Sequence, residues 1–243
     1  MPARPLLEEL ALAGPEHLDE AYVSGYDRKA AFDPDPDVEL LRSLGLGPGS
    51  TVVDLGAGTG TFALAVAPYC ERVVAVDVSP AMLDALSAKV AEHGATNVEC
   101  VQAGFLSYEH SGAPPEFVYS RNALHHLPDF WKVVALERTA ALLPDGGAFR
   151  LRDLVFSYEP VEVEAGIAAW LDRAAESSDD GWTRAELDTH LREEFSTFTW
   201  LLEPMLERAG FEIAAADYAP IGAYADYACL KRPDQTGFLN RRV

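Results

Sequence analysis

The chain has few cysteines and no long apolar run, and each shortage excludes a class of protein. Its 243 residues include three cysteines, Cys70, Cys100 and Cys229, which lie far apart and form no Cys-x-x-Cys pair. We therefore expect buried, reduced thiols and neither a disulfide framework nor a zinc site. No apolar stretch approaches the ~20 residues that a membrane helix requires, and residues 6–9 read Leu-Leu-Glu-Glu, which argues against a signal peptide. These features predict a soluble, cytoplasmic protein without a membrane partner.

Basic residues are also scarce. The chain has 19 Lys and Arg against 39 Asp and Glu, which gives a net charge of −20 at pH 7. Proteins bind nucleic acids through a basic face that neutralises phosphates, and no run of Lys or Arg indicates such a face here. The composition therefore argues against nucleic acids and anionic membranes as partners. The length suits one α/β domain with additions.

What the chain does contain is a strand–turn–helix–strand unit between residues 51 and 83. An apolar strand ends at Asp54, a glycine-rich turn covers residues 56–60, a helix follows over about 61–69, and a second apolar strand ends at Asp77. Glycines let the backbone approach a ligand closely, and the start of a helix offers free N–H groups to an anionic ligand. A carboxylate at the position of Asp77 can accept hydrogen bonds from both ribose hydroxyls. These features together favour a nucleoside site over a plain turn with a surface acid.

The spacing of the glycines distinguishes two nucleoside-binding families. The dinucleotide pattern Gly-x-Gly-x-x-Gly would require glycine at position 61, which is Thr61, whereas the third glycine here is Gly60. Asp54 also precedes the first glycine by two positions. The pattern Asp-x-Gly-x-Gly-x-Gly resembles motif I of the class I S-adenosylmethionine-dependent methyltransferases. The resemblance extends over about residues 38–232 and implies S-adenosyl-L-methionine as cofactor and S-adenosyl-L-homocysteine as product.

The same resemblance implies the fold. It is an α/β, Rossmann-like fold with a seven-stranded, mostly parallel sheet whose last strand is antiparallel, helices on both faces, and a helical cap inserted after the fifth strand. Residues 1–37 then form an N-terminal helical segment over the cofactor site, residues 38–154 and 204–243 form the core, and residues 155–203 form the cap. Asp37 is expected to cap a helix over about residues 38–44.

The resemblance also assigns cofactor contacts. Val78 and Met82 would flank adenine, and Arg121 and Asn122 would line the methionine moiety through their backbone. The family usually places an acid after the third strand, but residues 102–105 read Gln-Ala-Gly-Phe, so adenine is expected to lie against the backbone near Gly104 and to stack on Phe105. The full set of expected contacts is Asp54, Gly56, Ala57, Gly58, Asp77, Val78, Met82, Gly104, Phe105, Arg121 and Asn122.

The substrate is less well defined by the sequence. Residues 121–128, Arg-Asn-Ala-Leu-His-His-Leu-Pro, resemble motif IV of the small-molecule branch, and the Asn-Pro-Pro-Tyr motif of enzymes that methylate adenine or glutamine amides is missing. His125 is either a general base for a hydroxyl or phenol or a histidine that bonds within its turn. Asp153, at the end of the fifth strand, is a candidate to face the substrate. Methyl transfer from a sulfonium depends mainly on alignment, and no triad, metal cluster or carboxylate pair is visible, so catalytic residues stay unassigned and no metal is expected.

Aromatic residues outside the core are candidates to form the remaining walls of the site. In residues 1–37, Tyr22, Tyr26 and Lys29 either reach the methionine end of the cofactor or pack the helix that carries them. In the cap, Phe195, Phe198 and Trp200 either line an apolar or aromatic acceptor or anchor the cap to the core.

Three functions follow from these observations. We expect a methyltransferase that acts on a small-molecule acceptor, as a monomer or homodimer. The alternative is a catalytically silent module that binds S-adenosylmethionine to sense it or to scaffold a partner. A nicotinamide-dependent dehydrogenase is disfavoured by Thr61 and the position of Gly60.

Overall fold

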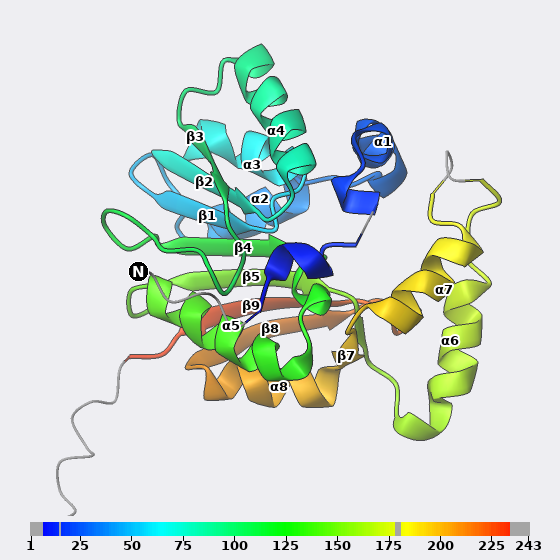
Figure 1. Cartoon of the computed structure of the whole chain (residues 1–243). Coiled ribbons are helices and arrows are strands. Elements are labelled where there is room, and N and C mark those ends of the chain that lie inside the picture. Colours follow the sequence, from blue (N-terminus) through cyan, green and yellow to red (C-terminus); the bar gives the residue numbers. More distant parts are fainter. Residues whose placement is uncertain (1–6, 15, 178–180, 234–243) are drawn as a thin grey trace, which may run out of the picture.

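The computed structural model describes residues 7–14, 16–177 and 181–233 of the chain. Seven strands form one sheet in the order β3-β2-β1-β4-β5-β9-β8 (Figure 1), and β9 runs antiparallel to both of its neighbours. The strands are β1 Thr51–Leu55, β2 Arg72–Asp77, β3 Val98–Gln102, β4 Phe117–Arg121, β5 Ala148–Asp153, β8 Phe211–Tyr218 and β9 Ala225–Lys231. The predicted sheet, mostly parallel with an antiparallel last strand, is confirmed.

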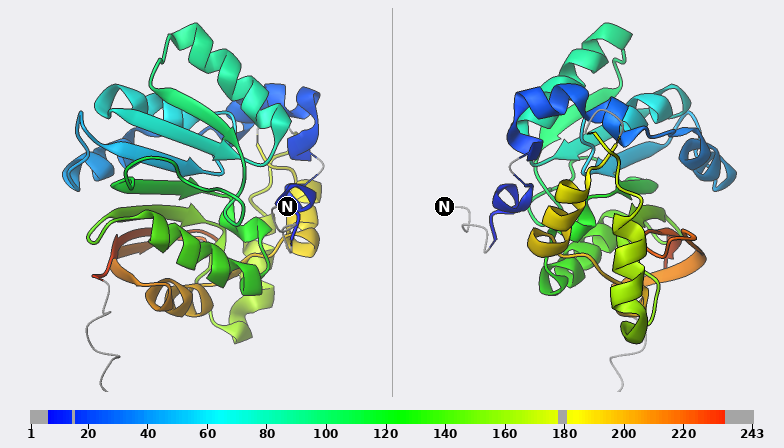
Figure 2. Two further views of the ribbon diagram at one scale, coloured as in Figure 1. Left: turned by 60° about the vertical axis from the view of Figure 1, so that its left-hand side comes forward. Right: turned by 90° about the vertical axis from the view of Figure 1, so that its right-hand side faces the viewer.

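Helices cover both faces of the sheet (Figures 1 and 2). One face carries α2 (Asp35–Ser43), α3 (Thr61–Val66) with the short 3-10 helix η3 (Ala67–Tyr69), and α4 (Pro80–His93). The other face carries α5 (Asp129–Leu142) and α8 (Thr199–Arg208). The strands between these layers are buried on both faces, which explains why β1 and β2 read as continuous apolar runs.

The strand order reverses at β1 and β4, which are adjacent although β2 and β3 come between them in the chain. In open parallel sheets ligands bind outside the carboxyl ends of the strands at such a reversal. The glycine turn follows β1 at this edge, and the 3-10 helix η4 (Leu124–His126) follows β4 there.

The cap is a small layer with a core of its own. It comprises β6 (Val155–Phe156), η5 (Pro160–Glu162), α6 (Val163–Leu171), α7 (Arg184–Glu193) and β7 (Thr197–Phe198), and β6 pairs with β7 in parallel. Thr183 and Glu186 form a capping box at the start of α7. The apolar core of the cap consists of Leu154, Phe156, Trp170, Leu171, Leu187 and Ala223. Because α8 begins at Thr199 and packs on the sheet, the boundary suggested at residue 203 falls inside a core helix.

The N-terminal part contains η1 (Glu9–Leu12), η2 (Glu16–Leu18) and α1 (Glu20–Ala30), which lies close to α4 and to the cap in Figure 1. The expected capping role of Asp37 is wrong, because α2 begins at Asp35 after Pro34. The buried Asp37 carboxylate instead accepts hydrogen bonds from the Tyr119 hydroxyl at 2.8 Å and from Arg150 Nε at 2.7 Å. It therefore ties α2 to two strands of the sheet.

Two expectations from composition can be compared with the structure. All three cysteines are free thiols, and Cys70 and Cys229 are buried while Cys100 is half-buried. Among the described residues, no helix is both long enough and apolar enough to cross a membrane.

Candidate active site

Asp77 is fixed by the turn that it faces. The Gly58 N–H donates to Asp77 Oδ2 and the Ser79 N–H donates to Oδ1, both at 2.8 Å. The residue is 9% exposed; burial raises the pKa of its carboxyl, and these two hydrogen bonds oppose that rise. The remaining lone pairs of the carboxylate are available to a ligand.

The three glycines of the turn have different physical roles. A Cβ on Gly56 would lie 2.3 Å from Ala123 Cβ, and a Cβ on Gly60 would lie 1.9 Å from Leu86 Cδ1, so close packing requires glycine at both positions. A Cβ on Gly58 would meet no atom within 4 Å, although the backbone φ of +54° still favours glycine. Gly58 therefore leaves open space where the turn borders a cavity.

The first cavity lies at the carboxyl ends of β1 and β4, and its empty space, open mouth included, is about 680 Å³. It is lined by nine of the expected contact residues, Gly56, Gly58, Asp77, Val78, Met82, Gly104, Phe105, Arg121 and Asn122. Asp54 and Ala57 line an adjoining hollow that shares four of these nine with the first cavity. The structure thus gathers all eleven residues in one place.

Asp54 lies at the end of β1 and is 2% exposed. Burial, and then the nearby charge of Asp77, raises the pKa of its carboxyl well above the ordinary value. Among the described residues its Oδ2 atom has no hydrogen-bond partner. A buried carboxylate oxygen without a partner fits a cationic group supplied by a ligand. The Asp54 carboxylate therefore suits the ammonium end of S-adenosylmethionine.

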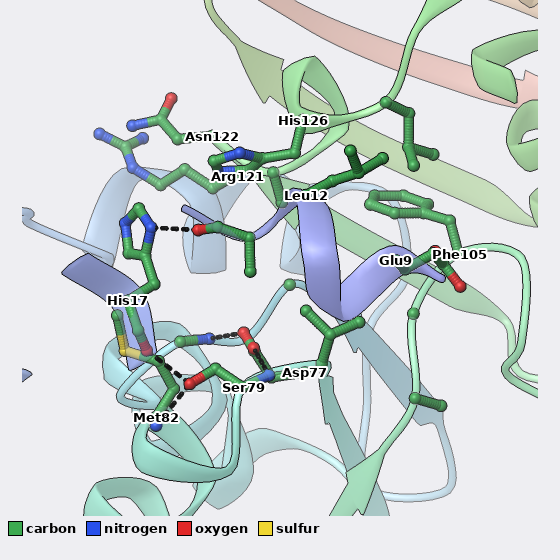
Figure 3. Close-up of a pocket in the computed structure, with 18 of the residues that line it drawn as sticks. Glu9, Leu12, His17, Asp77, Ser79, Met82, Phe105, Arg121, Asn122 and His126 are labelled. Atoms are coloured by element: carbon green, nitrogen blue, oxygen red, sulfur yellow. Dashed lines mark hydrogen bonds between the residues drawn. The ribbon is translucent and has the colours of Figure 1, made fainter. Parts of the chain in front are cut away.

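The N-terminal segment contributes Glu9, Leu12 and His17 to the wall of the first cavity (Figure 3). The Glu9 carboxylate accepts hydrogen bonds from the Leu106 N–H at 3.0 Å and from the Ser107 hydroxyl at 2.9 Å. A Cβ on Gly104 would lie 2.4 Å from Glu9 Oε1. Glu9 thus brings a carboxylate to the point where residue 104 has no side chain, a role that sequence reasoning missed because the two positions are far apart in the chain.

His17 adds a second anchor for this segment. Its carbonyl accepts a hydrogen bond from the Ser79 hydroxyl at 2.6 Å, and its imidazole lines the first cavity. Since Ser79 is also the N-cap of α4, one side chain joins the segment, the helix and the wall of the cavity.

A second cavity of about 830 Å³ adjoins the first beneath the cap. The two cavities share His17, Tyr26, Asn122 and His126. The rings that line the second cavity are those of His17, Tyr22, Tyr26, His125, His126, Trp170, Trp182, His190 and Tyr224. The second cavity therefore adjoins the first along these four shared residues.

The helix α1 contributes the aromatic wall that the sequence suggested. Tyr22 and Tyr26 both line the second cavity, and Tyr26 also lines the first. Lys29 does not reach either cavity; its ammonium pairs with Glu186 of α7 and lies 4.9 and 4.7 Å from the ring centroids of Tyr22 and Trp182. Lys29 thus connects α1 with the cap.

The two neighbouring histidines of η4 have opposite environments. Burial lowers the pKa of His125, but Asp153 on one ring nitrogen and Glu194 on the other outweigh burial and raise the pKa to about 9. Burial and the charge of His125 lower the pKa of His126 to about 3. Asp153 is 1% exposed and lines neither cavity, so the expectation that it faces the substrate is wrong. Its carboxylate binds His125 instead.

The cap aromatics singled out in the sequence do not line either cavity. Trp200 is 46% exposed on α8 and stacks on Phe198 with ring centroids 5.1 Å apart, and Phe195 is 39% exposed. Trp200 is therefore neither a substrate contact nor a core residue. A helix whose inner face is formed by Leu202 and Leu206 leaves residue 200 on its outer side.

The sheet order, the glycine turn and the acid at the end of β2 together define a nucleotide-type site in a methyltransferase fold. Residues 52–147 match a family model described as a methyltransferase domain. Over these residues the chain is similar to known methyltransferases, and its sheet has the order and strand directions of the class I S-adenosylmethionine-dependent methyltransferase fold.

Individual relatives agree with this assignment. The chain is 33% identical over 110 residues to the uncharacterized methyltransferase YcgJ of Bacillus subtilis, in an alignment that spans 45% of this chain and 43% of YcgJ. It is 29% identical over 180 residues to an uncharacterized methyltransferase of Exiguobacterium sibiricum, in an alignment that spans 74% of this chain and 77% of that protein.

Solved structures show the same fold. The crystal structure of YcgJ superposes with a TM-score of 0.61 at 18% identity, covering 81% of this chain and 98% of that one. The magnesium protoporphyrin IX methyltransferase of Synechocystis, solved with bound S-adenosylmethionine, gives a TM-score of 0.64 at 14% identity and covers 94% of this chain and 100% of that one.

Proposed function

We propose that the protein transfers a methyl group from S-adenosylmethionine to a small molecule held in the second cavity. The observation that carries this proposal is that the two cavities meet at His17, Tyr26, Asn122 and His126. The sulfonium supplies an activated methyl group when the cofactor is bound. The chain's own residues then have to hold two ligands in contact and in line, which is the main requirement of this reaction.

The eleven residues gathered at the first cavity and its adjoining hollow are the proposed cofactor site. Asp77 would accept hydrogen bonds from the ribose hydroxyls, Met82 and Phe105 would flank the adenine, and Asp54 would hold the ammonium group. Glu9 joins this set as an acceptor at the adenine end. The described parts of residues 7–37 act as the cover of this site, and those of residues 155–198 act as the cap over the acceptor.

The acceptor class follows from the lining of the second cavity. Tyrosine and tryptophan rings offer apolar faces, while the carboxylates of Glu16, Glu186 and Glu194 disfavour an anion. An aromatic or apolar molecule with a hydroxyl or amine as the methyl acceptor suits these walls.

Binding of the cofactor is tested by calorimetry on the wild type, on Asp77→Asn and on Asp145→Asn, a matched change in an exposed turn. Asn retains one acceptor oxygen but loses the charge, so we expect the affinity for S-adenosylmethionine to fall ~10- to 1000-fold in Asp77→Asn and to stay unchanged in Asp145→Asn. Equal affinity in all three proteins would remove Asp77 from the site.

Turnover is tested with S-adenosylmethionine that carries a deuterated methyl group and a panel of phenols, aromatic alcohols and aromatic amines. We expect S-adenosylhomocysteine and a labelled product by mass spectrometry. Tight cofactor binding without either product from any class of acceptor would favour the silent binding module.

A further inference from the structure

Three side chains with metal-binding atoms meet at the wall of the second cavity. His125 belongs to η4, whereas His190 lies in α7 and Glu194 is the residue directly after the end of α7. His125 Nε2 lies 3.1 Å from Glu194 Oε2, and His190 Nδ1 contacts the same oxygen. The three ligand atoms all lie within 4.8 Å of one another, and all three side chains line the cavity.

Each imidazole is oriented through its other ring nitrogen. His125 Nδ1 bonds to Asp153 Oδ1, and His190 Nε2 bonds to Ser196 Oγ at 2.8 Å. Asp153 is itself fixed, because it accepts the N–H of His125 at 3.1 Å and that of Leu154 at 2.7 Å. A carboxylate behind a histidine is the usual support of a metal-ligating imidazole, and it leaves the second nitrogen free for the ion.

The charges of the cluster also suit a divalent cation. Asp153 and Glu194 bring two negative charges into a site where Asp153 is 1% exposed. Glu194 Oε2 is buried, and the described groups that contact it include two ring nitrogens, His125 Nε2 and His190 Nδ1. One dication with two neutral imidazoles would balance these charges. Two protonated imidazoles would balance them as well, so the two arrangements need to be separated by experiment.

We propose that His125, His190 and Glu194 bind one divalent transition-metal ion of the zinc type. Two imidazoles and one carboxylate are a ligand set that holds such ions and leaves coordination positions open. Because the ligands line the second cavity, an open position faces the methyl acceptor. The role of the ion rests on the proposed function: it would bind an oxygen or nitrogen atom of the acceptor and fix it, which narrows the acceptor to molecules that chelate metal beside the methylated atom.

The test uses the full chain purified without a histidine tag and stripped with a chelator, in the absence of cofactor. Zn²⁺ is titrated by calorimetry, and Co²⁺ is titrated by visible absorption, which reports its coordination. We expect one ion per chain. Glu194→Gln and His190→Ala should weaken binding by at least about 100-fold, and Asp153→Asn, which acts through His125, should weaken it ~10- to 100-fold. Glu193→Gln and His93→Ala, both at exposed positions, are the matched controls and should bind as the wild type does.

Two results would overturn the proposal. One is a wild type that is folded by circular dichroism and takes up neither Zn²⁺ nor Co²⁺, which would establish the protonated imidazole network instead. The other is Zn²⁺ binding that persists in Glu194→Gln, which would place the ion elsewhere. Since no cofactor is present in these titrations, their failure is distinguishable from a failure of methyl transfer, which the labelled-cofactor assay measures separately.

Discussion

At the scale of single residues, Asp54 carries the clearest conflict between stability and ligand binding. Burial raises the pKa of its carboxyl, so the folded protein retains the proton to a higher pH than the unfolded chain does. The free energy of unfolding therefore falls as the pH rises through this interval. Asp54→Asn cannot ionise, and we expect it to be more stable than the wild type at neutral pH by at least about 1 kcal/mol, with an advantage that shrinks as the pH is lowered.

Thermal melts between pH 4 and pH 8 in the absence of cofactor measure this effect. The same variant should bind S-adenosylhomocysteine more weakly, while its affinity for methylthioadenosine, which lacks the ammonium group, should stay unchanged. Equal loss for both ligands would contradict the assignment of Asp54 to the ammonium.

The carboxylate of Glu9 can be moved to position 104 by a double substitution. Glu9→Ala removes the carboxylate at the proposed adenine end, and we expect cofactor affinity to fall ~10-fold or more, as for one charge-assisted hydrogen bond. Gly104→Asp alone should also disrupt the site, because its Cβ would lie 2.4 Å from Glu9 Oε1 and would push the Glu9 carboxylate away from its hydrogen bonds to Leu106 and Ser107. The double variant Glu9→Ala with Gly104→Asp removes the collision and restores a carboxylate, so calorimetry should show affinity recovered above that of either single variant. Additive losses would exclude a shared role.

At the scale of elements, the N-terminal segment depends on the start of α4. The Ser79 side chain caps this helix through the Met82 N–H at 3.2 Å and donates to the His17 carbonyl. Ser79→Ala should lower the free energy of unfolding by ~0.5–2 kcal/mol, as the loss of an N-cap does. It should also speed amide hydrogen exchange in η1 and η2.

Thr183→Ala is the matched control, because it removes the N-cap of α7 and leaves the contact between Ser79 and His17 intact. It should cost a similar free energy without faster exchange in η1 and η2. Identical exchange in the two variants would show that Ser79 does not tether the segment.

Local elements were predictable from the sequence where one short pattern determines them. The turn after β1 and the acid at the end of β2 follow from glycine conformation and strand length. The start of α2 was misjudged because proline ends a helix but is tolerated in its first turn, and Pro36 occupies such a position.

At the scale of the whole molecule, the parts that escaped prediction are contacts between distant segments. Nothing in the local sequence joins Glu9 to Gly104, or His125 to His190 and Glu194, because the folded topology alone brings them together. The exposed position of Trp200 likewise depends on which side of α8 meets the sheet. The periodicity of apolar residues was enough to predict the helices and strands. The residues that line the second cavity could not be predicted, because they depend on how these elements are arranged in space.

The cap and α1 both line the second cavity, and Lys29 joins them. Lys29 is buried at 8% exposure and pairs with Glu186 of α7, next to the rings of Tyr22 and Trp182. Lys29→Met keeps the apolar length of the side chain but loses the ion pair. We expect amide exchange in α6 and α7 to rise about tenfold, which corresponds to about 1.4 kcal/mol of opening free energy.

The apolar cluster of the cap is separate from the clusters on the two faces of the sheet, so we expect the cap to open without unfolding of the sheet and exchange in β1 and β4 to stay unchanged. The control is Arg42→Met, which removes the surface ion pair with Glu39 on α2 and should leave exchange in the cap as it is in the wild type. If Lys29→Met speeds exchange in β1 as much as in α7, the cap and the core unfold as one unit and access to the second cavity does not depend on this contact.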